Sequence, residues 1–382
     1  MAQERNKKVK VVQIIARMNV GGPAVIVADL MRSIDSSKVE QVLITGYCDA
    51  NEADYLETVA TDIKATRVAG LGRSVSLIAD VRAFFALVGM IKKIAPDVIH
   101  THTAKAGVLG RLAAILAGRK AKRIHTFHGH LLHGYFSGWK VKLVVAIEKF
   151  LAKRTDVLVA VGNQVKSDLL AAGIGKADQY RVFYPGLVEP AKVSKDAARK
   201  QFDMAADEIY VAYVGRMTAI KRPDRLLDTA AEIKARNLPV KFIVAGEGDL
   251  FEATKKDAAA RELPVRFLGW RKDIGALFAA SDIAILTSDN EGIPLTLIQA
   301  AQASLPIVST GVGSIGDIVV HEVNGYLVDS EPAALADALQ KLAIDPVLRE
   351  IMGKAGRERA TRYFSLEKMC ADHTELYQHL HR

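Results

Sequence analysis

Hydrophobic and polar positions along the chain alternate between short apolar runs and longer amphipathic segments. In the first half, β-branched runs predict strands over residues 9–16, 39–47, 97–100, 122–126 and 157–161. Segments of helical periodicity lie between them, over residues 21–31, 77–94, 106–117 and 139–154. Short apolar strands between longer helices are typical of βαβ units, in which a parallel sheet is buried on both faces.

The alternation stops after Tyr184-Pro185-Gly186, where a strand ends, and restarts beyond a polar stretch at residues 189–207. We interpret that stretch as a linker with a short helix. Strands are then predicted over residues 209–214, 241–245, 266–269, 283–286, 307–309 and 325–328. Helices are predicted over residues 223–236, 250–261, 274–280, 294–303, 331–342 and 346–363. Two doubly wound α/β domains follow, with ligands expected at the carboxyl ends of the strands and in a cleft between the domains.

Composition narrows the class of protein. Of the 382 residues, 50% are hydrophobic and 25% are charged, which is typical of a globular chain and excludes a disordered, collagen-like or coiled-coil protein. The two cysteines, Cys48 and Cys370, exclude a disulfide scaffold and a four-cysteine zinc site. They fit a reducing compartment.

The net charge of +9 is unevenly distributed. Residues 1–187 hold 27 Lys and Arg against 15 Asp and Glu, a net of +12. Residues 188–382 hold 25 against 28, a net of −3. The basic half implies an anionic partner, which composition alone leaves open among nucleic acid, a phosphorylated substrate and an anionic membrane.

No targeting or membrane-spanning segment is predicted. The apolar run at residues 11–15 is too short for a signal peptide, and no run approaches the roughly 18 residues of a spanning helix. We therefore expect a cytoplasmic protein. Peripheral contact with an anionic membrane stays open, because residues 133–154 mix aromatic and basic side chains; an ordinary solvated helix is the alternative. These side chains are Tyr135, Phe136, Trp139, Lys140, Lys142, Leu143, Lys149, Lys153 and Arg154.

The first motif that carries chemistry lies at residues 214–223, where a strand ends at Gly215 and Pro223 begins a helix. Arg216 and Lys221 lie in the connecting turn. Two fixed cations at the carboxyl end of a strand suit a diphosphate and stabilise it as a leaving group. The alternative is a solvated basic turn.

The second motif lies at residues 288–300, where an apolar strand leads into a polar turn and then a helix. The free N–H groups of a first helical turn favour oxyanions and hydroxyls. Glu291 lies beside them, and Gln299 follows about two turns into the helix. A carboxylate, free amides and an amide side chain suit a polyhydroxylated ligand, although Glu291 taken alone could be only a helix cap.

Histidines form the third motif and follow two neighbouring predicted strands. The first group is His100 and His102, and the second is His125, His128, His130 and His133. No acidic residue or cysteine accompanies them locally, so we expect hydrogen-bonding or proton-handling roles and no metal site. Gly21-Gly22 closes the first strand, where two glycines let a ligand approach the backbone.

Several standard motifs are absent. The Gly-Gly turn after the first strand is not a dinucleotide fingerprint, and the chain has no P-loop, Gly-x-Ser-x-Gly elbow, zincin motif or Asp-x-Asp pair. A diphosphate would therefore be held by Arg216, Lys221 and helix ends.

Together and in this order, the motifs resemble the two-domain GT-B glycosyltransferases, specifically the retaining family 4 group. The resemblance covers nearly the whole chain. Its parts are the Gly-Gly turn, His-x-His with Lys-Ala-Gly and Gly-Arg, Thr-Phe-His-Gly-His, Gly-Arg with a lysine five residues on, Gly-Glu-Gly-Asp, Phe-Leu-Gly-Trp and Glu-Gly-Ile-Pro. The histidine segments look most similar to bacterial enzymes of surface-polysaccharide and lipid-linked oligosaccharide assembly.

The resemblance implies a hexosyltransferase that moves a sugar from a nucleotide-diphosphate sugar, expected to be a UDP-sugar, to a glycan or lipid-linked acceptor. Residues 188–363 would bind the donor, and residues 1–187, joined by the last helix at 364–382, would bind the acceptor. Transfer would proceed with retention by front-face displacement, without metal or other cofactor.

Site residues are implied one by one. Arg216 and Lys221 match the pair that grips the diphosphate, and Glu291 matches the first acid of the E-x7-E motif, which contacts the donor sugar. His128 matches the cleft histidine near the reacting carbon, and Gly22 matches the turn that approaches the donor. The amides from Gly292 to Leu295, a segment that includes Ile293 and Pro294, would support the donor.

One position departs from the pattern, because Gln299 replaces the second acid of E-x7-E. That acid usually contacts the ribose hydroxyls. Glutamine still forms hydrogen bonds there but loses their charge-assisted strength. We therefore expect altered donor affinity or nucleotide preference and no loss of catalysis.

Two other functions remain open. A nucleotide-sugar epimerase of the same fold would convert its substrate without an acceptor. A non-catalytic sugar-nucleotide or nucleic-acid binding protein would use the basic half. Nucleic acid is not expected as a partner, because aromatic residues make up 6% of the chain and do not interleave with basic ones.

Overall fold

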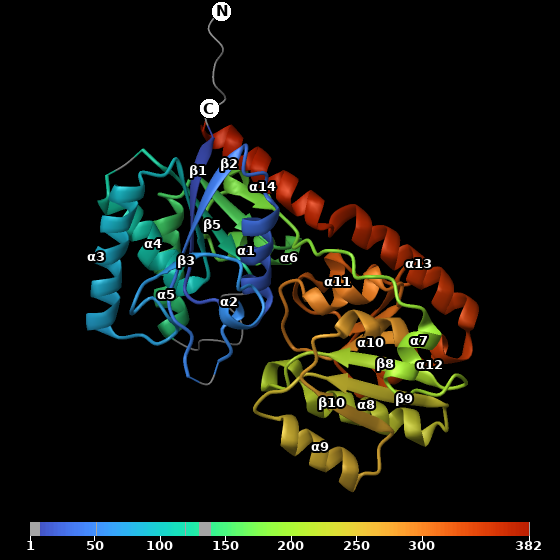
Figure 1. The fold of residues 1–382 in the computed structure, drawn as a ribbon. Coiled ribbons are helices and arrows are strands. Elements are labelled where there is room, and N and C mark those ends of the chain that lie inside the picture. Colours follow the sequence, from blue (N-terminus) through green and yellow to red (C-terminus); the bar gives the residue numbers. More distant parts are fainter. Residues whose placement is uncertain (1–7, 51, 119, 130–138, 382) are drawn as a thin grey trace, which may run out of the picture. The chain divides into compact units, whose positions relative to one another are not determined.

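A computed structural model describes residues 8–50, 52–118, 120–129 and 139–381. The chain divides into two compact units: unit 1 comprises Met1–Gly186 and Leu366–Arg382, and unit 2 comprises Leu187–Ser365. The C-terminal helix, α14 (Leu366–His381), therefore belongs to the N-terminal unit and contacts α1 (Gly22–Ser33), as Figure 1 shows.

Unit 1 is built on a seven-stranded parallel sheet with the order β3-β2-β1-β4-β5-β6-β7. Its strands are β1 (Val9–Ile15), β2 (Val39–Thr45), β3 (Ala65–Arg67), β4 (Val98–His102), β5 (Lys122–Phe127), β6 (Val157–Ala160) and β7 (Tyr180–Val182). Besides α1 and α14, its helices are α2 (Tyr55–Thr58), α3 (Leu77–Ile94), α4 (Ala104–Leu116), α5 (Trp139–Ala152), α6 (Asn163–Ala171) and the short 3₁₀ turn Ala177–Gln179. The strand order reverses between β1 and β4, which is the switch point of the sheet.

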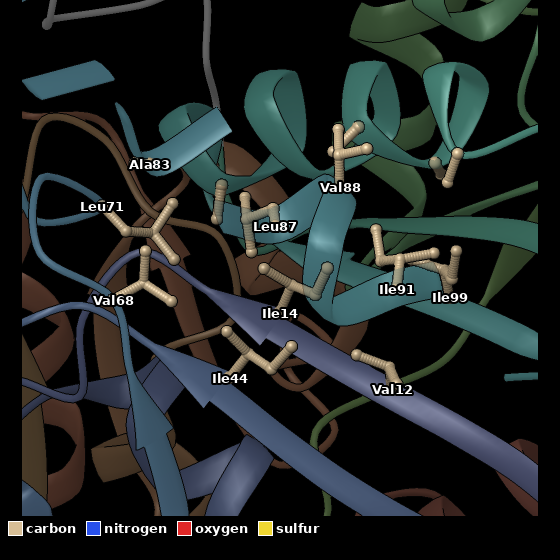
Figure 2. Packing of buried hydrophobic residues seen from close by; sticks show 14 of the residues in the cluster. Val12, Ile14, Ile44, Val68, Leu71, Ala83, Leu87, Val88, Ile91 and Ile99 are labelled. Atoms are coloured by element: carbon tan, nitrogen blue, oxygen red, sulfur yellow. The ribbon is translucent and has the colours of Figure 1, made fainter. Parts of the chain in front are cut away.

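The core of unit 1 follows from strand alternation. Val12 and Ile14 of β1 point to one face and pack with Ile44 and Ile99 beneath α3 and α4, as Figure 2 shows. Ile15 points to the opposite face and packs against α1. Because successive side chains of a strand alternate between faces, an apolar run such as Val9–Ile15 covers both sides of the sheet.

A buried ion pair joins α4 to α5. The Arg111 guanidinium Nη2 lies 2.7 Å from both carboxylate oxygens of Glu148, and both side chains are almost fully buried. Gly107 and Gly110 precede Arg111 on α4. A Cβ at Gly107 would lie 2.4 Å from the ring of His125, so this glycine allows α4 to pack closely on β5. The Lys-Ala-Gly and Gly-Arg parts of the histidine motif therefore have structural roles.

Unit 2 holds a six-stranded parallel sheet with the order β10-β9-β8-β11-β12-β13. The strands are β8 (Ile209–Val214), β9 (Val240–Ala245), β10 (Val265–Gly269), β11 (Ile283–Leu286), β12 (Ile307–Thr310) and β13 (Gly325–Val328). The helices are α7 (Lys195–Gln201), α8 (Pro223–Ala235), α9 (Phe251–Ala260), α10 (Ile274–Ala280), α11 (Leu295–Gln302), α12 (Pro332–Ile344) and α13 (Pro346–Tyr363). The switch point of this sheet lies between β8 and β11.

The two doubly wound α/β units confirm the predicted fold class. The stretch at residues 189–207 contains α7, so it carries the short helix expected there. The predicted end of β4 at His100 was wrong, because the strand continues to His102 and takes both histidines into the sheet. The strand predicted to end at Tyr184-Pro185-Gly186 corresponds to β7. Three short elements, α2, β3 and α6, were not predicted, since runs of three to nine residues carry little periodicity.

Among the described helices, none combines the length and the hydrophobicity that crossing a bilayer requires.

Candidate functional site

Two loops of unit 2 meet at the carboxyl ends of neighbouring strands. The loop after β8 carries Arg216 and Lys221, and the loop after β11 carries Glu291. β8 and β11 pair in parallel, with Ile283 opposite Val211 and Ile285 opposite Tyr213. Their carboxyl ends therefore lie side by side at the switch point, which brings together residues about 70 positions apart in the sequence.

The two loops are joined by a charged contact. Lys221 Nζ donates to Glu291 Oε1, and Ser288 Oγ donates to the same oxygen over 2.6 Å. The side chains of Lys221 and Glu291 are 19% and 10% exposed, so the pair is largely shielded from water. Arg216 is exposed and forms no ion pair or side-chain hydrogen bond with any described residue. The site thus holds one neutralised cation and one available cation.

Glycines shape both loops. At Gly246, with φ +132°, a Cβ would lie 2.0 Å from the carbonyl oxygen of Gly215. At Gly313, with φ +56°, a Cβ would lie 1.8 Å from the carbonyl oxygen of Glu291. Only glycine fits at these close approaches, so the Gly-Glu-Gly-Asp motif supports the turn that carries Arg216. Main-chain bonds add support, including Met217 N to Glu247 O at 3.0 Å and Asp289 N to Ile220 O at 2.9 Å.

The helix α11 begins directly after Glu291-Gly292-Ile293-Pro294. Its Leu297 N–H bonds to the Pro294 carbonyl, whereas the N–H groups of Leu295 and Thr296 have no main-chain acceptor within the described part of the chain. This first turn offers donors to an anionic or hydroxyl group. Gln299 lies one turn further on, is partly exposed and has no side-chain hydrogen bond to a described residue.

Tyr213, near the end of β8, is a polar residue that sequence reasoning missed. Its side chain is fully buried, and its Oη has no hydrogen-bond partner among the described residues. Burial raises the pKa of this phenol, and the nearby Glu291 carboxylate adds to the effect. Its phenol lies beneath Gly215, where a Cβ would be 3.4 Å from Oη. The sequence feature that could have pointed to Tyr213 is a hydroxyl-bearing residue within an otherwise apolar predicted strand.

In unit 1, Gly21 and Gly22 follow β1, and His128 follows β5. Gly21 is extended, with φ 168°, and a Cβ there would meet nothing closer than Asn19 O at 3.8 Å. The fold of unit 1 therefore does not require glycine at position 21. Space beside the backbone at position 21 is open, and the approach of a ligand to this turn stays a prediction.

The sequence suggested that all of these histidines follow strands, but the structure places three of them within strands. His100 and His102 lie within β4, and His125 lies within β5. Strand alternation separates them: His100 and His102 point to the face that meets α14, whereas His125 contacts Thr101 Oγ1 at 2.9 Å on the α4 face. His128 is partly exposed and is hydrogen-bonded through Nε2 to His102 Nδ1 at 2.9 Å. His130 and His133 lie outside the described residues.

Burial keeps these imidazoles neutral. It lowers the pKa of His128 to about 3, with the nearby His373 contributing to the effect, and lowers the pKa of His373 to about 4. The pKa values of His100, His102 and His125 also lie well below 6.5, mainly because of burial. At neutral pH each ring therefore carries one proton, as a hydrogen-bonding group requires. Within the described ranges, no three His, Cys, Asp or Glu side chains are arranged to hold a metal ion.

Comparison with known proteins gives these sites their context. Residues 194–359 match the family described as glycosyl transferases group 1, and residues 21–186 match a glycosyl transferase 4-like domain. The chain is 30% identical to the UDP-Gal:alpha-D-GlcNAc-diphosphoundecaprenol alpha-1,3-galactosyltransferase of Escherichia coli over 335 residues. The aligned region covers 85% of each chain. The chain belongs to the group 1, family 4-type glycosyltransferases.

Other glycosyltransferases show the same likeness. The capsular polysaccharide biosynthesis glycosyltransferase CapM of Staphylococcus aureus is 23% identical over 341 residues, covering 85% of this chain and 88% of CapM. Among solved structures, sucrose-phosphate synthase from Thermosynechococcus elongatus superposes with a TM-score of 0.81 at 21% identity, covering 97% of this chain and 99% of that one. Anabaena Alr3699/HepE in complex with UDP and glucose gives 0.80 at 22% identity, covering 96% and 99%. These structures confirm the GT-B fold of this glycosyltransferase.

The neutral histidines predict that unit 1 of this glycosyltransferase loses stability as the pH falls. Their folded-state pKa values lie below the ordinary value of 6.5, so the unfolded chain binds more protons below pH 6.5. The stabilisation is complete above pH 6.5 and is lost as the pH falls toward about 4, the pKa of His373. Each such histidine contributes about 1.4 kcal/mol per pH unit across that window.

Hydrogen exchange measured at about pH 7.5 and about pH 5, corrected for the intrinsic rates, checks this expectation. Peptides from β4 and β5 should lose protection at the lower pH, and peptides from β8 and β11 should lose less. His321→Gln, a change on the surface of unit 2, is the control and should leave the pH dependence unaltered. Equal protection of β4 and β5 at both pH values would contradict the assignment of neutral, buried rings.

Proposed function

We propose that the protein is a retaining hexosyltransferase that moves a sugar from a UDP-sugar to a glycan or lipid-linked acceptor in the assembly of a cell-surface polysaccharide. The observation that carries the proposal is the meeting of Arg216, Lys221 and Glu291 at the carboxyl ends of β8 and β11. The named activity of the Escherichia coli relative and the UDP bound to HepE support the donor class. CapM supports the polysaccharide setting.

We assign donor binding to residues 188–363. Arg216 has an exposed guanidinium with no acidic partner among the described residues, so it can receive a diphosphate without first breaking an ion pair. Lys221 is already paired with Glu291 and supplies a shielded positive charge beside it. Across the segment Gly292–Leu295, which leads into α11, every residue except Pro294 offers a main-chain N–H, and these groups add donors without adding charge. Together these groups would stabilise the negative charge that develops on the leaving diphosphate.

We assign Glu291 to the hydroxyl groups of the donor sugar. Its Oε1 accepts from Lys221 and Ser288, which fixes the orientation of the carboxylate. A carboxylate held in this way is a directed acceptor for sugar hydroxyls, and its charge is balanced before the ligand arrives. Gln299, which has no partner among the described side chains, would contact the ribose through neutral hydrogen bonds.

Acceptor binding is assigned to residues 1–187 together with residues 364–382, and His128 to the region near the reacting sugar carbon. Gly22 would line the approach to the donor. In front-face displacement the acceptor hydroxyl forms the new bond to the anomeric carbon on the side from which the diphosphate leaves. Its proton passes to the departing phosphate oxygen. No residue of the chain then has to form a covalent intermediate, and no metal or other cofactor takes part.

Removing the positive side chain that is proposed to bind the diphosphate should abolish most of the sugar transfer. Arg216→Ala should lower kcat about 100-fold or more, because a fixed charge that stabilises the leaving group is removed. Lys221→Ala should also lower kcat, although it leaves Glu291 without its counter-charge, so Arg216→Ala is the cleaner test. The measurement is sugar transfer from UDP-sugars to an undecaprenol-diphosphate-linked acceptor and to free glycans.

Lys255→Ala is the matched control, because it removes one exposed positive charge from α9 of the same unit. It should leave transfer unchanged. Full activity in both Arg216→Ala and Lys221→Ala would reject the diphosphate assignment. Conversion of the nucleotide sugar without any acceptor would favour the epimerase, and binding of UDP-sugars without turnover would favour a non-catalytic binding protein.

Gln299→Glu should retain turnover and chiefly change the KM for the donor. The substitution restores a charged acceptor for ribose hydroxyls, and charge-assisted hydrogen bonds are about twice as strong as neutral ones. Steady-state kinetics with several nucleotide sugars measures the effect, and Gln340→Glu on α12 provides a charge-matched control. A folded but inactive Gln299→Glu protein would rule out this role for position 299.

We also propose that unit 1 contacts an anionic membrane surface through α5. Its exposed face carries Trp139, Leu143 and Phe150 together with Lys142 and Lys149, and the exposed Lys153 follows directly after the helix. These positions recur at helical spacing, so apolar and basic side chains share one face, which suits an interface rich in anionic lipid. The helix α3 exposes Ile78, Val81 and Phe85, and both α3 and α5 pack against α4. Tyr135 and Phe136 lie outside the described residues.

Flotation with liposomes tests the membrane proposal. At low salt the protein should float with vesicles that contain phosphatidylglycerol and stay behind with neutral vesicles, because the lysines of α5 need anionic headgroups. A Lys142→Glu/Lys149→Glu variant should lose co-flotation, whereas Lys255→Glu/Lys256→Glu, on α9 of unit 2, should retain it. Failure of the wild-type protein to float with anionic vesicles at low salt removes the idea.

A further inference from the structure

A continuous line of hydrogen bonds runs through unit 1 from α1 to His128. It lies on the sheet face that meets α1 and α14 and passes through Gln41 of β2, Gln13 of β1 and His102 of β4. Gln13 and His102 are fully buried. A buried line of this kind has a defined direction, because each link needs one donor and one acceptor.

The donor-to-acceptor direction of this line follows from its contact with a main-chain carbonyl. Gln41 Nε2 lies 2.9 Å from the carbonyl oxygen of Leu30, and a carbonyl oxygen only accepts. Gln41 must therefore place its amide nitrogen toward α1. Its Oε1 is then directed at Gln13, whose Nε2 donates to it over 3.1 Å.

Gln13 extends the line of hydrogen bonds to β4 with the same donor-to-acceptor direction. Its Nε2 uses its second N–H on Tyr377 Oη of α14, at 3.0 Å. Both donors of the amide are thus used on one side, and Gln13 Oε1 meets His102 Nε2 at 2.8 Å. Because the amide oxygen only accepts, His102 carries its proton on Nε2.

The last link fixes His128. His102 is neutral, since burial lowers its pKa well below 6.5, so its Nδ1 has a lone pair and no proton. That nitrogen lies 2.9 Å from His128 Nε2, which must therefore be the protonated nitrogen of the His128 ring. His128 Nδ1 then has a free lone pair. It is buried, has no hydrogen-bond partner among the described residues, and its ring lines a small cavity with His373 and Phe183.

A side branch holds the line in place from the C-terminal helix. Tyr377 Oη accepts from Gln13 and donates to His100 Nδ1 at 2.7 Å, and His100 Nε2 donates to Thr126 Oγ1 at 2.6 Å. The branch uses the phenol proton away from Gln13, so it reinforces the direction of the main line. It ends at Thr126 and does not pass through His128.

We propose that Gln13 and His102 are positioning residues that hold His128 as the Nε2–H tautomer and so present Nδ1 as a hydrogen-bond acceptor for a hydroxyl group of the sugar substrate. The ligand class rests on the proposed function; the tautomer itself rests only on the hydrogen bonds. A lone pair in this place accepts from a hydroxyl or amino group and repels a ring or carbonyl oxygen. The relay thereby favours substrates with a free hydroxyl at the matching carbon.

Nitrogen NMR of histidine-labelled protein without ligand tests the tautomer directly. The His128 signals, assigned by their loss in His128→Ala, should show a protonated Nε2 and an unprotonated Nδ1 at neutral pH. Gln13→Leu removes the acceptor for His102 and should yield a mixture of the two His128 tautomers. Thr126→Val, which removes one buried hydrogen bond of the side branch, is the matched control and should keep the wild-type pattern.

Two results would overturn the proposal. One is a wild-type His128 protonated on Nδ1, which decides the matter even if Gln13→Leu fails to fold. The other is a folded Gln13→Leu protein whose His128 tautomer equals that of the wild type. Both NMR measurements of the His128 tautomer are independent of catalysis, so they remain valid even if no transfer activity is found.

Kinetics separate positioning from simple support of the fold. Gln13→Leu should lower kcat/KM about tenfold in the wild-type background, the scale of one neutral hydrogen bond. It should have little further effect in a His128→Ala background, because its action passes through that ring. The same fractional loss in both backgrounds would show that Gln13 supports the fold alone.

Discussion

Parallel strand pairing at the two switch points is the constraint on which the rest of the structure depends. In unit 2 it sets the loop after β8 beside the loop after β11, and in unit 1 it sets β1 beside β4. Carboxyl ends of parallel strands share one edge, so polar loops gather there while apolar strands stay buried. Gly246, after β9, and Gly313, after β12, approach the main chain of these two loops at Gly215 and Glu291 within distances that no side chain would permit.

Charge is handled differently in the two units. In unit 2, Glu291 is balanced by Lys221, while Arg216 has no acidic partner in the described part of the chain. The diphosphate site proposed for this slightly acidic unit needs no basic domain, because two local cations and free helix amides act at short range. In unit 1 the positive charge is spread over the surface, as on α5, while the interior pairs its buried guanidinium, Arg111, with Glu148. The surplus of basic residues thus concerns the surface of the proposed acceptor unit.

Unit 1 holds a layer of buried polar side chains within its hydrophobic core. Burying Gln13, His100, His102 and Tyr377 would be unfavourable if any of them lacked a partner, because an unsatisfied buried polar group costs about 1–3 kcal/mol. Each of the four finds its partners on a neighbouring strand or on α14. The network accordingly ties the C-terminal helix to the first strand, and within the described residues it leaves the buried His128 Nδ1 without a hydrogen-bond partner.

The sequence by itself determined the alternation of strands and helices, the two α/β units and the motifs at residues 214–223 and 288–300, because periodicity and turn residues are local signals. It also placed Arg216, Lys221 and Glu291 in loops at strand ends. Only the tertiary structure decided that Lys221 pairs with Glu291 and that His100 and His102 lie inside β4. Gln13 and Tyr377 are separated by 364 positions, so their contact depends on strand order and helix packing, which no local pattern encodes.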